Sequence, residues 1–106
     1  MMNSIKPLHT KTVERLEVNV YSTRRELGAA AGADVAARIR WLLSTRPAIR
    51  MIFAAAPSQN EMLETLVAAE GIDWPRVTAF HMDEYIGLPE DAPQRFGRYL
   101  RDHLFD

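Results

Sequence analysis

The sequence predicts an α/β fold: a parallel, Rossmann-like sheet with helices on both faces, in three α/β/α layers. Short apolar runs alternate along the chain with amphipathic stretches of helical spacing, which is the pattern of successive βαβ units. No apolar run follows the last of these stretches. We therefore expect residues 1–106 to form a single domain that is an incomplete, amino-terminal portion of such a fold.

Composition limits the classes of function. The chain is 47% hydrophobic and 25% charged, with a net charge of −1, which is an ordinary globular balance. It contains no cysteine, which excludes disulfides and thiolate metal sites. It has neither a membrane-length apolar run nor a secretory signal, so we expect a cytoplasmic protein with no membrane partner. Its basic residues are scattered along a helix without interleaved aromatic residues, so we expect no nucleic-acid partner.

The first predicted elements are an edge strand and a long helix. Residues 16–21 alternate apolar and polar side chains, as a half-buried or edge strand does, and residues 1–15 are expected to be flexible. Thr23 and Glu26 form a capping box that starts a helix, and Pro47 ends it. The apolar face predicted for this helix consists of Leu27, Ala31, Val35, Ile39 and Leu42.

The second half of the chain repeats the alternation. Residues 49–55 form an almost wholly apolar run, typical of a parallel strand covered on both faces. Ser58 and Glu61 form a second capping box that opens a helix, and Gly71 occupies the left-handed position expected after its end. The remaining predicted elements are a buried strand, a loop and a final helix, over residues 77–82, 87–89 and 93–104.

The ends of the two buried strands carry the candidate functional residues. Carboxyl ends of parallel strands meet at one edge of a sheet, so both should frame one pocket. The first end, residues 55–58, passes into a helix N-terminus, whose amides favour an anion. This segment has no glycine, Pro57 has no N–H, and Glu61 adds a negative charge. An ordinary strand-to-helix turn is an equally good interpretation.

At the second strand end, His81, Asp83, Glu84 and Tyr85 cluster within five residues. An aspartate such as Asp83, in a partly desolvated pocket, can act as a general base, because desolvation raises its pKa. His81 and Asp83 could share a metal, but such a pair is weak evidence, and we expect neither metal nor cofactor. In the alternative interpretation, Asp83 and Glu84 cap a turn and Tyr85 packs at its rim.

The stretch from residue 76 to 89 contains the pattern F-x-M-D-E-Y-x-G-L, and it resembles the glucosamine-6-phosphate deaminase/isomerase family. The related 6-phosphogluconolactonases carry Asp-Glu-Arg within this motif, so Tyr85 favours the deaminase side of the resemblance. The family converts glucosamine 6-phosphate into fructose 6-phosphate with release of ammonia. The partner that the resemblance implies is a small-molecule sugar phosphate, and a homo-oligomer is a further expectation.

The resemblance also implies roles for individual residues. Asp83 would move a proton between C2 and C1 of the sugar. The segment around Ser58 takes the place of the family's Gly-rich phosphate loop, and Ser58 itself matches a hydroxyl residue of that loop. The substrate-binding residues implied in this way are Ala56, Pro57, Ser58, Glu84 and Tyr85.

Part of the family pattern has no match in this sequence. The family enzymes are much longer, and their second half carries an Asp-x-His motif that opens the sugar ring. We therefore expect the 106-residue chain alone to have little or no activity. Two other functions stay open: a non-catalytic module that binds sugar phosphates or a partner, and a 6-phosphogluconolactonase-like hydrolase. The first is motivated by Ala56 and Pro57, which stand where the family has glycines.

Overall fold

The computed structural model describes residues 5–54, 56–84, 86–89, 91–92 and 95–105. Its helices and strands, in chain order, are β1 (His9–Val13), β2 (Leu16–Val20), α1 (Arg24–Thr45), β3 (Ile49–Phe53), α2 (Asn60–Ala68), β4 (Val77–His81) and α3 (Phe96–Leu100). Short 3₁₀ turns cover Pro57–Gln59 and Trp74–Arg76, and a π-helical turn over Arg101–Phe105 continues α3. None of the helices in these described ranges is long and apolar enough to cross a membrane.

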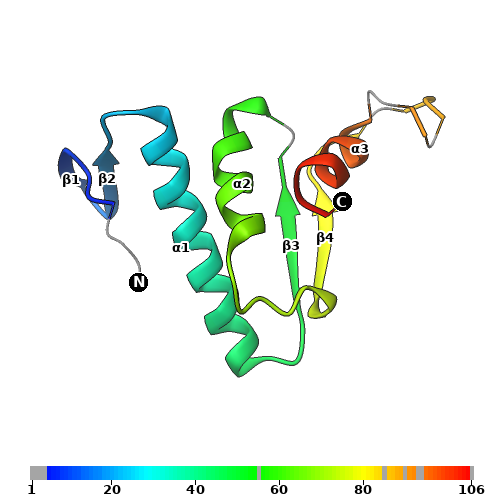
Figure 1. Cartoon of the computed structure of the whole chain (residues 1–106), viewed down its shortest axis with the longest axis horizontal. Helices are drawn as coiled ribbons and strands as arrows, with labels where there is room; N and C mark the ends of the chain where they lie inside the picture. Colours follow the sequence, from blue (N-terminus) through cyan, green and yellow to red (C-terminus); the bar gives the residue numbers. More distant parts are fainter. Residues whose placement is uncertain (1–4, 55, 85, 90, 93–94, 106) are drawn as a thin grey trace.

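The strands form two separate sheets, with α1 and α2 between them (Figure 1). β3 and β4 pair in parallel, with Ile49 opposite Val77 and Phe53 opposite His81. The segment that connects them contains α2, so the pair is a βαβ unit. This pairing confirms the predicted α/β class with its parallel sheet.

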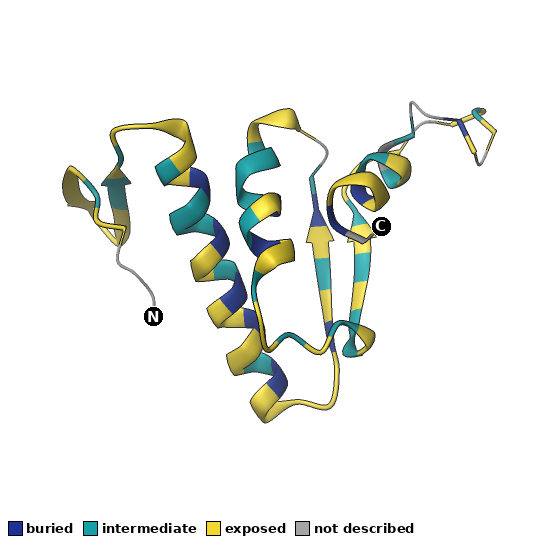
Figure 2. Ribbon diagram, viewed as in Figure 1, coloured by how far each residue is buried: buried dark blue, intermediate teal, exposed yellow. Residues whose placement is uncertain are grey.

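One face of the parallel sheet is packed against the helices and the other is open (Figure 2). The core cluster takes Ile49 and Phe53 from β3, and it also includes leucines from α1, α2 and the end of the chain. On the open face, Ile52 is 69% exposed and Phe80 is 50% exposed. The described residues therefore form two layers, and the second helical layer of the predicted three-layer fold is not among them.

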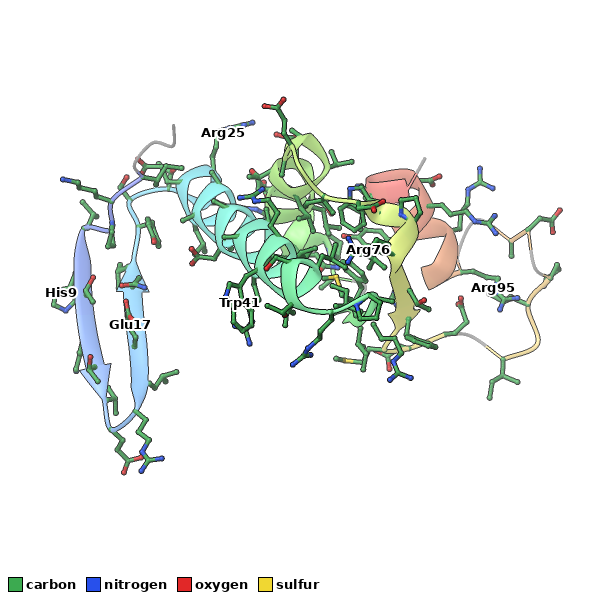
Figure 3. The ribbon with its side chains drawn as sticks, turned by 90° about the horizontal axis from the view of Figure 1, so that it is seen from below. His9, Glu17, Arg25, Trp41, Arg76 and Arg95 are labelled. Carbon is green, nitrogen blue, oxygen red and sulfur yellow. The ribbon has the colours of Figure 1, made fainter. Side chains whose placement is uncertain are left out.

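β2 lies outside the parallel sheet. The strand predicted at 16–21 is present, but it pairs antiparallel with β1, whose residues lie in the segment expected to be flexible. The turn between the two strands contains Glu14, which has a positive φ of 56°. Figure 3 shows this hairpin, which carries His9 and Glu17, extending away from the helices. The sequence pattern had revealed one strand of the hairpin and not its partner.

α1 begins and ends as predicted, but it buries a different face. Thr23 caps its start, because its hydroxyl oxygen accepts the Glu26 N–H at 3.1 Å. Leu27, placed on the predicted core face, is 50% exposed, so that prediction was wrong by about one position. The residues that α1 buries are Gly28, Gly32, Ala36, Ile39 and Leu43.

Two glycines explain this rotation of α1. A Cβ atom on Gly32 would lie 2.6 Å from the Cβ of Thr65 in α2, and one on Gly28 would collide with Glu61. Real Cβ atoms do not approach so closely, so the two helices can meet here only where α1 has no side chain. The contact between α1 and α2 therefore follows the smallest residues of α1, and the larger apolar residues lie beside it.

Arg76 closes the carboxyl-terminal end of α1 (Figure 3). Its guanidinium donates to the carbonyl oxygens of Leu43 at 2.7 Å, Arg46 at 2.6 Å and Pro47 at 2.8 Å. The last carbonyls of a helix lack donors within the helix and form its negative end, which favours a cation. Since β4 starts at the next residue, this side chain joins the end of α1 to the parallel sheet.

We expect Gly32→Ala to lower the free energy of unfolding by about 1–2 kcal/mol, because the added methyl group must displace Thr65. Urea unfolding followed by circular dichroism measures the change. The control is Ala37→Ser on the exposed side of α1, which should stay within about 0.5 kcal/mol of the parent. A Gly32→Ala chain that is as stable as the parent would contradict the close contact.

We expect Arg76→Gln to destabilise the fold by about 1–2 kcal/mol, because three carbonyl oxygens lose a charged donor. Arg50→Gln, on the open face of the sheet, removes the same charge and should change stability by less than about 0.5 kcal/mol. Thermal unfolding of both variants tests this difference. Equal effects of the two substitutions would show that Arg76 does not act as a cap.

Candidate active site

The carboxyl ends of β3 and β4 lie side by side at one edge of the parallel sheet (Figure 1). Phe53 and His81 are the last paired residues, and the next N–H, that of Met82, donates to the Phe53 carbonyl at 2.8 Å. The segments after the two strands therefore start from adjacent points. This confirms the predicted proximity of the two strand ends.

The turn after β3 is fixed mainly through its carbonyl oxygens. The Gln59 side-chain amide donates to the Ala54 carbonyl, and the Gln59 backbone N–H donates to the Ala56 carbonyl at 3.0 Å. The backbone N–H of Asn60 donates to the Pro57 carbonyl. Residue 55, within the predicted strand end, lies outside the described residues. The turn thus has a defined shape although it contains no glycine.

The capping box predicted from Ser58 and Glu61 is wrong. Ser58 lies within a 3₁₀ turn, α2 begins only at Asn60, and the residue that caps α2, Gln59, makes no side-chain capping bond. Ser58 is exposed. The sequence pattern failed because Glu61 has a stronger partner outside the turn, the guanidinium of Arg24.

Arg24 links the start of α1 to the turn after β3. Its Nε donates to Glu61 Oε1 at 2.8 Å, and its Nη2 donates to the Pro57 carbonyl at 2.7 Å. The hydrogen bond from Arg24 is the main cause that holds the pKa of Glu61 below its ordinary value of 4.5. The negative charge that the sequence places in the first turn of α2 is therefore paired with a cation.

Tyr99 holds the same turn from the other side. Its hydroxyl donates to Asn60 Oδ1 at 2.6 Å and also lies 3.0 Å from the Ala56 carbonyl oxygen. Sequence analysis placed no functional role on Tyr99 or Asn60. No local signal marks this contact, because the two residues are 39 positions apart and meet only in the folded chain.

Asp83 follows β4 and is exposed. It makes no hydrogen bond or ion pair with another residue of the described ranges, so its carboxylate faces solvent beside the sheet edge. A carboxylate in this position can accept a proton from a ligand bound at the edge. Tyr85, the other polar candidate of this segment, lies outside the described residues.

Glu84 contacts the start of α3. Its Oε2 accepts the Gly97 N–H at 3.0 Å and lies 3.5 Å from the Nε of Arg95. A carboxylate at the first N–H groups of a helix satisfies donors that have no partner inside the helix. This contact fits the interpretation in which Glu84 caps a turn, and it ties α3 to the end of β4.

His81 and Asp83 have different surroundings. His81 is half-buried, with both ring nitrogens shielded from solvent, whereas Asp83 is exposed. Across the residues for which the structure gives positions, no group of three or more histidine or acidic side chains is arranged to hold a metal ion. The pair therefore gains no further ligand from the fold.

A hollow of about 380 Å³ lies next to the end of β4. Glu84 borders it, together with arginines from the start and the far end of the last helical segment, among them Arg95 (Figure 3). Acidic and basic side chains alternate around it, and Glu84 pairs with Arg95 across one side. The full lining comprises Glu84, Asp91, Arg95, Gly97, Arg98 and Arg101.

Comparison with known proteins adds to this geometry. The chain is 32% identical over 93 residues to a glucosamine-6-phosphate deaminase of Pseudarthrobacter chlorophenolicus, covering 86% of this chain and 34% of that protein. It is 28% identical over 92 residues to the glucosamine-6-phosphate deaminase of Halothermothrix orenii, covering 85% of this chain and 37% of that protein. The chain is similar to glucosamine-6-phosphate deaminases. It spans about a third of the length of these curated relatives.

A solved structure agrees on the fold. A monomeric glucosamine-6-phosphate deaminase of the NagB superfamily superposes with a TM-score of 0.66 at 24% sequence identity. The match covers 78% of this chain and 34% of that one. No protein-family model matches the chain. The similarity therefore concerns a segment of a deaminase, with the α/β fold of such a segment.

We expect Tyr99→Phe to loosen the turn after β3, because the turn loses the hydroxyl between Asn60 and the Ala56 carbonyl. The cost should be about 1 kcal/mol, together with faster hydrogen exchange at the Gln59 N–H. Tyr21→Phe removes a hydroxyl far from the turn and serves as the control. Unchanged exchange at Gln59 in the Tyr99→Phe chain would show that this hydroxyl does not hold the turn.

Proposed function

We propose that the protein is a deaminase–isomerase that converts glucosamine 6-phosphate and water into fructose 6-phosphate and ammonia, and that this chain supplies its amino-terminal part. The observation that carries the proposal is the position of Asp83, exposed at the sheet edge where the turn after β3 also lies. The similarity to deaminases over most of the chain supports it, and those relatives are enzymes.

Asp83 is proposed as the residue that moves the proton. In the open-chain sugar, the hydrogen on C2 is acidic because C1 is a carbonyl carbon. The Asp83 carboxylate would remove this proton to give an enediol-type intermediate and would return it to C1. The nitrogen on C2 is then part of an imine, and water hydrolyses this imine to the ketone and ammonia. A carboxylate suits both transfers, because it takes up and releases a proton at one place.

The turn from Ala56 to Ser58 is proposed to bind the phosphate of the sugar, and Tyr85 to line the pocket beside Asp83. This assignment rests on the family pattern and on the adjacent strand ends. Glu84 is proposed to shape the pocket indirectly, through its contact with the start of α3. The proposed location is the cytoplasm, because a charged sugar phosphate does not diffuse across membranes.

A complete reaction needs groups beyond these residues. The chain spans about a third of the relatives' length, and no Asp-x-His motif for ring opening occurs in its sequence. We therefore expect the 106-residue chain to bind the sugar phosphate weakly and to release ammonia below detection. The comparisons lend no support to a lactonase or to a non-catalytic binding module.

The proton-transfer step can be measured separately from ring opening. Fructose 6-phosphate in deuterated buffer contains some open-chain ketone, and a base at C1 exchanges its hydrogen for deuterium. We expect the chain to catalyse this exchange and Asp83→Asn to lower the rate at least about 100-fold. Nuclear magnetic resonance follows both the C1 signal and the folded state of the protein.

The matched control is Asp91→Asn, which removes a carboxylate from the neighbouring hollow and should leave the exchange rate unchanged. Exchange by Asp83→Asn at the parent rate would refute the role of Asp83. If the parent chain neither exchanges C1 nor shifts its amide signals when glucosamine 6-phosphate is added, the assigned substrate is wrong.

A further inference from the structure

Arg24 occupies an unusual position relative to the proposed phosphate-binding turn. It belongs to α1, yet its guanidinium bridges the Pro57 carbonyl and the Glu61 carboxylate, at 2.7 and 2.8 Å. The two groups that it joins lie on either side of Ser58. Both carry negative charge or partial negative charge, and both would disfavour an anion bound at this turn.

We propose that Arg24 is a positioning residue that makes this turn able to accept an anionic substrate, by neutralising Glu61 and by turning the Pro57 carbonyl away from the ligand. This inference rests on the proposed function, because the anion is the phosphate of the sugar. Arg24 acts through the turn and through Glu61, and it does not itself contact the substrate.

The geometry of the Pro57–Ser58 peptide supports the second part of this role. The described peptide bonds are all trans, and in a trans peptide the C=O and N–H groups point in opposite directions. Because the Pro57 carbonyl faces Arg24 and the Asn60 N–H, the Ser58 N–H points away from both. That N–H therefore faces the side of the turn opposite the Arg24 contact, where an anion can reach it.

The charge of Glu61 supports the first part. A carboxylate in the first turn of α2 stabilises the helix, but it repels a phosphate at the same helix end. The Glu61 side chain is 29% exposed and its charge is paired by Arg24, whose own side chain is 58% exposed. The substitution of glycines by Ala56 and Pro57 makes this pairing more important, because the turn offers fewer N–H groups to an anion.

Arg25 provides a matched comparison within the same helical turn. It also pairs with a glutamate of α2, but the distance to Glu64 is 3.5 Å and the two side chains are 79% and 70% exposed. Glu64 lies one helical turn beyond Glu61 and makes no contact with the turn after β3 that the structure records among its described residues. Removal of Arg25 therefore changes the net charge equally without touching the proposed phosphate site.

The test is a set of binding titrations with glucosamine 6-phosphate, followed through the backbone amide signals of the 106-residue chain. We expect Arg24→Gln to bind about tenfold more weakly than the parent, because Glu61 is left uncompensated. Glu61→Gln should bind as well as the parent or better. The double variant should recover to within about threefold of Glu61→Gln, and Arg25→Gln should match the parent.

Rescue by Glu61→Gln separates the proposal from its rivals. If the double variant binds as weakly as Arg24→Gln, Arg24 contacts the phosphate directly or only supports the fold, and the proposal is overturned. Equal weakening by Arg24→Gln and Arg25→Gln would also overturn it, since the effect would then be one of net charge.

A measurement without ligand distinguishes this proposal from the proposed function. Hydrogen exchange at the Gln59 and Asn60 N–H groups should be faster in Arg24→Gln than in the parent, because the turn loses its link to α1. If Arg24 controls exchange but the parent chain binds no sugar phosphate, the proposed function fails and the anion role falls with it. If exchange is unchanged while the parent binds, the proposed function stands and the role of Arg24 is wrong.

Discussion

The close contact of α1 with α2 is the constraint on which the candidate site depends. Gly28 lies against Glu61 and Gly32 against Thr65, with no room for a side chain on α1. Arg24 lies one helical turn before Gly28 on the same helix, so the contact that brings Glu61 to Gly28 also brings it to Arg24. A wider spacing of the two helices would separate the guanidinium from the Pro57 carbonyl. The turn after β3 thus takes its position from two glycines that never touch it.

The same turn is held from its other side by the end of the chain. Tyr99 reaches it from α3, and α3 is itself tied to the end of β4 through Glu84 and the Gly97 N–H. Elements from both halves of the chain therefore meet around one short segment. The segment's position depends on tertiary packing more than on its own conformational preferences, because its carbonyl oxygens accept donors from α1, α2 and α3.

What the sequence revealed and what it concealed follow from the range of the interactions. The start of α1 could be predicted because Thr23 and Glu26 are three residues apart and satisfy each other locally. The same logic failed at Ser58 and Glu61, because the partner of Glu61 lies 37 residues away. The buried face of α1 was misplaced for a related reason: hydrophobicity marks large side chains, whereas this contact selects glycine. Likewise, the proximity of Asp83 to the turn after β3 followed from the parallel strand order, but the tether through Tyr99 did not.

A turn without glycine can still serve a ligand if other residues do what glycine does elsewhere. Glycine allows a backbone to approach an anion and to turn its carbonyls away from it. Here Ala56 and Pro57 lack that freedom, and side-chain donors from Gln59, Arg24 and Tyr99 orient the carbonyls instead. Such a turn is stiffer than a glycine loop, because each carbonyl is fixed by a partner outside its own peptide. It should therefore accept a narrower range of anion positions, and specificity for one sugar phosphate would arise from the packing of three helices against a single strand end.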